Sequence, residues 1–148
     1  MSELVVSLPI GIVRLKAEQG KLAAIERVTT KTGPTKTDDP VLKNAAAQLA
    51  EYFAGKRSSF DMPLAPAATP FQAKVRQAML AIPFGQTATY GEIAKTVGTK
   101  SAQAVGQAVG ANPFCVVVPC HRVVAAEGLG GFAWGLPTKK KLLRVERG

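Results

Sequence analysis

The feature that most constrains the fold is an irregular stretch near the middle of the chain, residues 57–68, which contains Pro63 and Pro66. Proline fixes φ and has no backbone N–H, so neither a helix nor a central strand runs through this stretch. A chain of 148 residues with 47% apolar content buries one sizeable core or two small ones, and the break favours two. The sequence therefore predicts an α/β (α+β) protein with two domains, residues 1–66 and 67–148.

The first half contains three mostly apolar, β-branched runs separated by turn residues. These runs are Val5–Leu8, Gly11–Leu15 and Leu22–Val28, and they predict a small antiparallel meander. After a polar loop, Asp39 and Pro40 form an N-cap and first-turn pair, and apolar residues then recur at helical spacing. One helix is therefore expected after the sheet.

The second half contains short helices with well-marked ends. Thr69 precedes a proline at the start of the first helix, and Thr89 with Glu92 three residues later forms a capping box. Gly98 ends that second helix, and Ser101 caps the next one. Two short helices joined by a tight turn form a helix-turn-helix, whose second helix enters a groove of DNA, although an ordinary helical hairpin has the same pattern.

The charge balance favours a polyanionic partner. Nineteen Lys and Arg against ten Asp and Glu give a net charge of +9, which suits nucleic acid or an anionic membrane surface, with a generally basic surface as the alternative. No uncharged run approaches the roughly 20 residues that span a bilayer, so we expect a cytoplasmic protein without a membrane partner. One histidine and two cysteines are poor material for a zinc site, so no metal is expected.

The only histidine follows a cysteine in the stretch VVVPCHRV. Val116–Val118 is predicted as a buried strand, and Pro119 would then open a turn or short helix with Cys120 in its first turn. Helix amides and neighbouring cations lower the pKa of a thiol, which makes Cys120 a candidate nucleophile, with an inert buried cysteine as the alternative. His121 would act as a base through water, oriented by Glu127 or Glu146, and spacing leaves both carboxylates open.

The surroundings of PCHRV resemble one family. Asn112-Pro113 precedes the motif, Gly130-Gly131-Phe132 follows it, and Leu142-Leu143-x-x-Glu146 lies near the end of the chain. With TPFQAKVRQAMLAIPFGQTATYGEIA and PIGIVRL, these segments are similar to the O6-alkylguanine-DNA alkyltransferase family over nearly the whole chain. The resemblance implies a ribonuclease H-like N-terminal domain, a C-terminal domain with the helix-turn-helix, and repair of alkylated guanine in DNA.

The resemblance also implies a mechanism and its residues. The damaged base is rotated out of the duplex, and its alkyl group passes irreversibly to Cys120, once per molecule and without a cofactor. The implied catalytic residues are Cys120, the base His121, its orienting partner Glu146, and Tyr90 as a hydroxyl donor to the purine. The implied substrate-binding residues are Asn112, Val123, Phe132, Ala133 and Trp134. The implied DNA-binding residues are Tyr90, Lys100, Ser101, Gln103, Ala104, Gly106 and Arg122. The expected partner is double-stranded DNA, which a monomer would bind through the minor groove. The cytoplasmic protein would be associated with the nucleoid when it is on DNA. Cooperative binding and activity on O4-alkylthymine stay open.

This chain departs from the family at several positions. Gln103 stands where the family usually has arginine, so base extrusion is expected to be less well supported. Phe132 replaces a frequent tyrosine, and the bulk of Trp134 is expected to narrow the pocket in favour of methyl groups. Cys115 has no family role and is expected in the core, although a bridge to Cys120 would switch the protein off.

Three other functions stay open. The first is a non-catalytic alkyltransferase-like module that binds lesions, although such relatives commonly have tryptophan where Cys120 stands. The second is a cysteine hydrolase or thiol redox enzyme, which would leave the helix-turn-helix and the charge without a purpose. The third is a basic DNA-binding regulator, for which PCHRV would be a coincidence.

Overall fold

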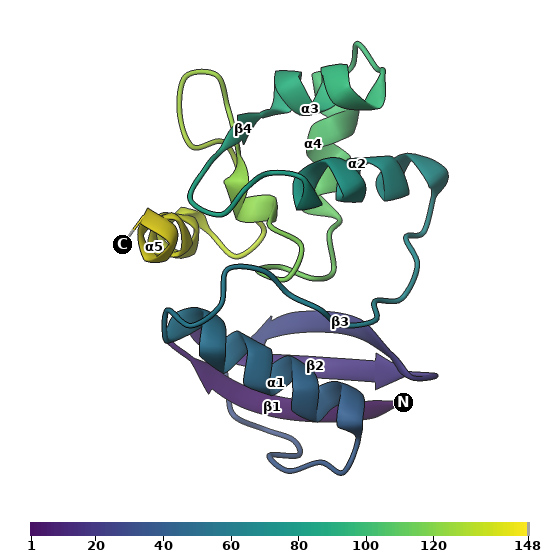
Figure 1. Cartoon of the computed structure of the whole chain (residues 1–148), viewed down its shortest axis with the longest axis vertical. Coiled ribbons are helices and arrows are strands. Elements are labelled where there is room, and N and C mark those ends of the chain that lie inside the picture. Colours follow the sequence, from purple (N-terminus) through teal and green to yellow (C-terminus); the bar gives the residue numbers. More distant parts are fainter. Residues whose placement is uncertain (148) are drawn as a thin grey trace. The chain divides into compact units, whose positions relative to one another are not determined.

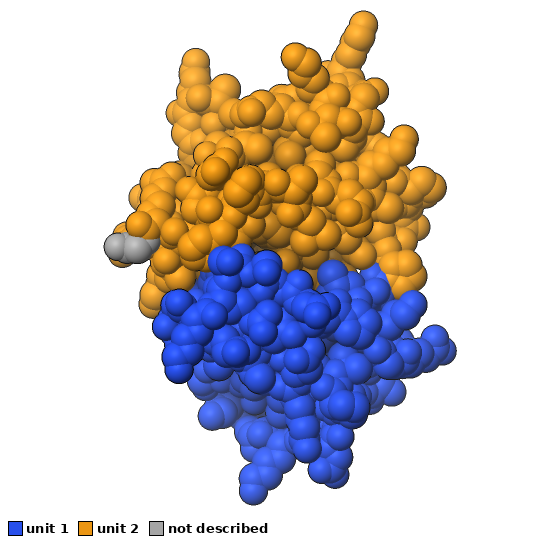
Figure 2. Space-filling view, viewed as in Figure 1, with its two compact units in different colours: residues 1–65 blue, residues 66–148 orange. Residues whose placement is uncertain are grey.

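The computed structural model describes residues 1–147, which form two compact units divided between Ala65 and Pro66 (Figures 1 and 2). The first unit is a sheet with one helix, and the second is mainly helical. The predicted α/β (α+β) class is confirmed. In the described part of the chain, no helix is long and apolar enough to cross a membrane.

The first unit contains the predicted meander. Strands β1 (Ser2–Leu8), β2 (Gly11–Glu18) and β3 (Lys21–Val28) pair antiparallel in the order β1-β2-β3. Alternate residues of β2 are buried, and helix α1 (Pro40–Phe53) packs against all three strands (Figure 1). The Asp39 carboxylate accepts the Val41 amide at 2.9 Å, so the predicted N-cap is confirmed.

The second unit places three helices around one core. Helix α2 (Pro70–Leu80) packs against α3 (Tyr90–Val97) and α4 (Ala102–Gly110), and each helix contributes apolar residues to their contact. The remaining elements are strand β4 (Ala88–Thr89), the 3-10 helix η1 (Cys120–Arg122), strand β5 (Val123–Val124) and helix α5 (Leu136–Arg147). Parallel pairing of β4 with β5 brings the start of α3 next to the end of η1, although more than thirty residues separate them in the chain.

The helix-turn-helix forms as predicted because its ends are satisfied locally. Thr89 and Glu92 exchange both capping-box bonds at 3.0 Å, and the Ser101 hydroxyl accepts the Ala104 amide at 3.0 Å. Between the helices, Gly98 has φ 82°, a left-handed conformation that glycine adopts without steric cost. The turn therefore fixes the start of α4.

The predicted strand at Val116–Val118 is wrong. These residues form a tight turn closed by the Val118 amide, which donates to the Phe114 carbonyl at 2.8 Å, and Val116 has φ 78°. The Asn112 side chain supports the turn by donating to the Val118 carbonyl and accepting the Phe114 amide, both at 3.0 Å. An apolar run predicts burial correctly, but it does not distinguish a buried strand from a buried turn whose polar groups are paired by one asparagine.

Candidate active site

Cys120 is the first residue of η1 and lies directly after the asparagine-braced turn. The residue is 3% exposed, and its Sγ is 3.6 Å from the Sγ of Cys115 on the other side of the turn. The hydrogen bond from Cys115 lowers the pKa of the Cys120 thiol, against the effect of burial, and the Asn112 side chain and the positive charge of Lys139 lower this pKa further. Cys120 is therefore a thiol whose anion is stabilised inside the protein.

His121 and Arg122 both turn toward one buried carboxylate of α5. His121 Nε2 is 2.6 Å from Glu146 Oε2, and the Arg122 guanidinium donates to both Glu146 oxygens at 2.8 and 3.0 Å. Two backbone groups complete the network, because Arg122 also donates to the Ile82 carbonyl at 2.7 Å and the Gly85 amide donates to Glu146. The structure thus brings Glu146 to His121.

The His121 imidazole is neutral in this setting. Burial lowers its pKa, and the charges of Arg122 and Lys139 lower it further, while the bond to Glu146 raises it. With the Nε2 proton donated to Glu146, Nδ1 carries the free lone pair, and this buried atom has no hydrogen-bond partner in the described protein. A neutral imidazole with a free nitrogen can accept a proton.

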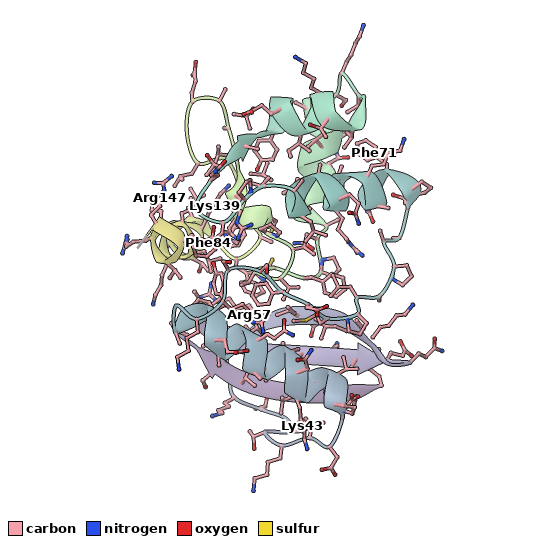
Figure 3. The ribbon with its side chains drawn as sticks, viewed as in Figure 1. Lys43, Arg57, Phe71, Phe84, Lys139 and Arg147 are labelled. Atoms are coloured by element: carbon pink, nitrogen blue, oxygen red, sulfur yellow. The ribbon has the colours of Figure 1, made fainter. Side chains whose placement is uncertain are left out.

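Lys139 of α5 was not predicted as a site residue, yet its side chain is fully buried (Figure 3). Its ammonium donates to the Leu129 carbonyl, to the Val123 carbonyl at 2.6 Å and to the Gly131 carbonyl at 2.9 Å, so one side chain connects β5 to the loop after it. Burial lowers the pKa of Lys139, while the nearby Cys120 thiolate raises it. In the sequence this lysine looked like part of a charged run, but it shares a helical face with Leu142 and Glu146, a spacing that could have revealed it.

A cavity of about 140 Å³ lies against Cys120. Its lining residues are Tyr90, Gly106, Val109, Gly110, Cys120, Gly131, Phe132 and Ala133. Five of these were predicted site residues, and they come from α3, α4, η1 and the loop before α5. The cavity therefore lies between the helix-turn-helix on one side and η1 with the loop before α5 on the other.

Tyr90 stands on one wall of this cavity at the first position of α3. Burial raises the pKa of its hydroxyl, which remains protonated and able to donate a hydrogen bond. Gly130 lies directly against the ring, because a Cβ on this glycine would be 2.8 Å from Tyr90 Cε2. Gly130 has φ 72°, so both its backbone and its lack of a side chain fit this contact.

Three predicted pocket residues lie outside the cavity lining. Asn112 braces the turn below Cys120, and Val123 is buried with its carbonyl bound to Lys139. The Trp134 ring packs edge-on against Phe132 with centroids 6.4 Å apart, and Trp134 does not line the cavity, so the geometry gives no support to the expected narrowing by this residue.

The predicted DNA-binding residues divide into two groups. Lys100, Ser101 and Gln103 are exposed where α4 begins, and Ala104 and Gly106 are half-buried along the same helix. Arg122 is different, because it is 6% exposed and its guanidinium contacts Glu146, the Ile82 carbonyl and the face of Phe84. This burial argues against the predicted DNA contact and makes Arg122 a support for Glu146.

Positive charge is concentrated in the second unit. From residue 66 onward the sequence has ten Lys and Arg but three Asp and Glu, so +7 of the net charge of +9 belongs to this half. Among the described residues, no group of three or more His, Cys, Asp or Glu side chains is placed to hold a metal ion. The site thus combines a basic unit with a thiol, an imidazole and a carboxylate.

Both halves of the chain match known protein families. Residues 70–148 match the family described as 6-O-methylguanine DNA methyltransferase, DNA binding domain, and residues 4–66 match 6-O-methylguanine DNA methyltransferase, ribonuclease-like domain. A methylated-DNA–protein-cysteine methyltransferase of Methanosarcina acetivorans is 43% identical over 145 residues, which cover 93% of each chain.

Solved structures agree with these matches over the whole fold. The crystal structure of Mycobacterium tuberculosis OGT in complex with DNA superposes with a TM-score of 0.87 at 37% identity, covering 98% of this chain and 92% of that one. An O6-methylguanine DNA methyltransferase of Methanococcus jannaschii superposes with a TM-score of 0.73 at 31% identity, covering 97% of this chain and 93% of that one. Because both halves match and the relatives are alike over nearly their full length, the chain belongs to the 6-O-methylguanine DNA methyltransferase family.

Proposed function

We propose that this protein repairs O6-alkylguanine in DNA by moving the alkyl group to the sulfur of Cys120. The observation that carries the proposal is the Cys120 sulfur at a cavity wall, next to a neutral His121 held by Glu146. A stabilised thiolate is a soft nucleophile suited to attack at an alkyl carbon. The family match and the relatives' names support the same chemistry.

The reaction begins with removal of the thiol proton. His121 Nδ1 accepts it through a water molecule, and Glu146 stabilises the imidazolium that forms, as the 2.6 Å contact to Nε2 supports. Cys120 Sγ then attacks the alkyl carbon, the bond from that carbon to O6 breaks, and its electron pair stays on the guanine. Tyr90 donates its hydroxyl to the purine, where negative charge develops.

The product limits each molecule to one reaction. A thioether has no sulfur–sulfur bond, so thiol exchange cannot regenerate Cys120. No cofactor is required, because the thiol takes the alkyl group and the guanine keeps the electron pair. The expected stoichiometry is one alkyl group per protein molecule.

A base inside a duplex cannot reach a sulfur that is 3% exposed, so the damaged nucleotide must leave the stack. We place α4 in the minor groove, with Lys100, Ser101 and Gln103 exposed at its start and Gly106 beside the cavity. Minor-groove contacts are degenerate between the two orientations of a base pair, which suits a protein that searches all DNA. Binding as a monomer, without a requirement for cooperativity, is part of this proposal.

The cavity restricts the substrate. A volume of about 140 Å³ favours small alkyl groups such as methyl over benzyl-sized groups, and Phe132 supplies its aromatic wall. The Ala133 backbone lines the cavity and is better placed to read the base edge than Val123, whose carbonyl is bound to Lys139. An O4-alkylthymine is smaller than an O6-alkylguanine and would leave part of the cavity wall uncontacted. We therefore expect its alkyl group to be transferred more slowly.

The second candidate function is binding of the lesion without transfer. The stabilised Cys120 thiol argues for transfer, since a binding module has no use for a nucleophile. The deciding experiment mixes the protein with a duplex carrying O6-methylguanine and analyses intact protein and peptides by mass spectrometry. One methyl group on the Cys120 peptide is expected, and none with an undamaged duplex. Retained DNA binding with no methyl transfer would support the binding module instead.

Two controls complete the experiment. Cys120→Ser should bind the duplex but take up no methyl group, because its hydroxyl remains protonated. DNA affinity of the wild-type protein should fall steeply with salt, since Lys and Arg contacts release counterions from phosphates. A flat salt response would contradict DNA binding through the basic second unit.

A further inference from the structure

We propose that Cys115 is a positioning residue for alkyl transfer, and that its thiol donates a hydrogen bond that holds the Cys120 sulfur as an anion facing the cavity. This inference rests on the proposed function and extends it to a residue that does not line the cavity. The Cys115 sulfur lies 3.6 Å from the Cys120 sulfur, and its burial at 2% exposure keeps the pair away from solvent.

The turn fixes the distance between the two sulfurs. Cys115 and Val118 form an isolated bridge, and the Val118 amide donates to the Phe114 carbonyl at 2.8 Å. Asn112 pairs with both ends of this turn, so the backbone on either side of Cys115 is held by hydrogen bonds. The resulting separation of 3.6 Å between sulfurs lets the neutral Cys120 thiol donate to Cys115, and once Cys120 is ionised only Cys115 can be the donor.

The two thiols are not equivalent, which sets the direction of the hydrogen bond. Cys120 lines the cavity and lies near the positive charge of Lys139, whereas the hydrogen bond with Cys120 and burial raise the pKa of Cys115 far above its ordinary value. Cys115 therefore keeps its proton and Cys120 gives its proton up. A hydrogen bond to an ionised acceptor is stronger than one between neutral groups, and a dry site strengthens it further.

Other groups near Cys120 do not replace this donor. Lys139 acts through its charge, since its ammonium protons are donated to three backbone carbonyls. His121 directs Nε2 to Glu146, and the Tyr90 hydroxyl is hydrogen-bonded to the Gly131 backbone. Asn112 contributes through its side chain but is also engaged by the turn, so the Cys115 thiol, 3.6 Å away, remains as a donor beside the anion.

The test compares wild type, Cys115→Ala and Cys115→Ser, all kept reduced. Serine retains a donor at the same position, and alanine removes it. The pH dependence of iodoacetamide labelling at Cys120, read peptide by peptide, gives the titration midpoint of that sulfur, and the methyl-transfer rate is measured over the same pH range. For Cys115→Ala we expect a higher midpoint and a transfer rate about tenfold lower at neutral pH, one pKa unit being a factor of ten in thiolate. The methyl-transfer rates of wild type and Cys115→Ala should converge in alkaline solution. The titration midpoint and the transfer rate of Cys115→Ser should lie closer to those of wild type.

The outcomes separate this inference from the proposed function. An unchanged Cys120 midpoint in Cys115→Ala, or an equal shift in the alanine and serine variants, would overturn the role of the Cys115 proton. If Cys115→Ala does not fold, a serine variant whose midpoint rises as far as that of an ordinary exposed thiol also overturns it. Absence of methyl uptake by wild type would overturn the proposed function, whatever the labelling shows.

Discussion

His121 and Glu146 are 25 residues apart in the chain, yet their side chains meet at 2.6 Å with almost no exposure to solvent. The contact forms because η1 and α5 pack together and because Arg122 neutralises the same carboxylate. An isolated carboxylate would be costly to bury, whereas this one accepts from an arginine, a histidine and an amide. The position of His121, the proposed base, therefore depends on the same contacts that stabilise the second unit.

Glu146→Gln tests this link. The amide keeps the shape but leaves Arg122 without a counter-charge, so we expect a loss of about 3–5 kcal/mol of unfolding free energy. Methyl transfer should fall as well, because the imidazolium loses its stabilising charge. Denaturant unfolding and single-turnover kinetics measure the two effects. Glu127→Gln is the matched control, since Glu127 is exposed in a turn and its loss should change neither quantity.

Stability should depend on pH through His121, the only histidine. Burial holds its pKa below the unfolded value of about 6.5, so the unfolded chain binds more protons than the folded chain just below that pH. This contribution is complete above about pH 6.5 and is lost as pH falls toward the folded pKa. The thermal midpoint should therefore drop between pH ~7.5 and ~5.5, and His121→Gln should flatten this drop. An equal drop in the variant would assign the effect to other groups.

Lys139→Met keeps the length of the side chain and removes its three donors. Each carbonyl that finds no other donor should cost about 1–3 kcal/mol, partly offset because a desolvated ammonium is also removed. We expect lower stability and slower transfer at neutral pH, since Cys120 loses a stabilising positive charge. Thermal unfolding and transfer kinetics check both results. Lys140→Met, at the exposed neighbouring position, should leave them unchanged.

Gly130→Ala should displace Tyr90. The new Cβ would lie 2.8 Å from the Tyr90 ring and 3.2 Å from the Ala125 amide, at a φ that L side chains avoid. A small displacement of the hydroxyl should slow methyl transfer on the order of 10-fold to 100-fold. Gly128→Ala is the control, because a Cβ there meets nothing within 4 Å. Equal methyl-transfer rates in Gly130→Ala and Gly128→Ala would show that the position of Tyr90 does not affect the reaction.

Gln103→Arg should assist extrusion of the damaged base. Gln103 is exposed at the start of α4, and a longer charged side chain there can fill the gap left in the duplex. About 1 kcal/mol of extra transition-state stabilisation would speed repair of duplex DNA about fivefold. The reaction with free O6-methylguanine should not change. Gln107→Arg adds the same charge at another exposed position of α4. An equal gain in the rate of duplex repair in that variant would show that the added charge, and not the filling of the gap, causes the effect.

Local rules predicted the helices well because their ends are paired locally. The Asp39, Thr89 and Ser101 caps and the Gly98 turn each depend on residues within four positions, so a short stretch of sequence contains both partners of each interaction. The strand predicted at Val116–Val118 was wrong for the opposite reason. Its turn depends on Asn112, whose pairing partners are not visible in periodicity.

Much of the site depended on contacts between distant segments. The stretch VVVPCHRV identified Cys120 and His121 as candidates, but spacing alone could not choose between Glu127 and Glu146, since the choice depends on how α5 packs. The burial of Arg122 and the three hydrogen bonds of Lys139 were equally inaccessible, because charged residues are expected at the surface unless their partners are known. Only tertiary structure supplies those partners.

The turn that carries the thiols also has an energetic consequence. Val116 adopts φ 78°, which for a β-branched residue costs on the order of 1–3 kcal/mol and persists only because the surrounding packing enforces it. Glycine at this position would relax the backbone and make the unit more durable, but it would also let the two sulfurs drift apart. If each molecule reacts only once, as proposed, the protein loses little by a lower free energy of unfolding at this turn.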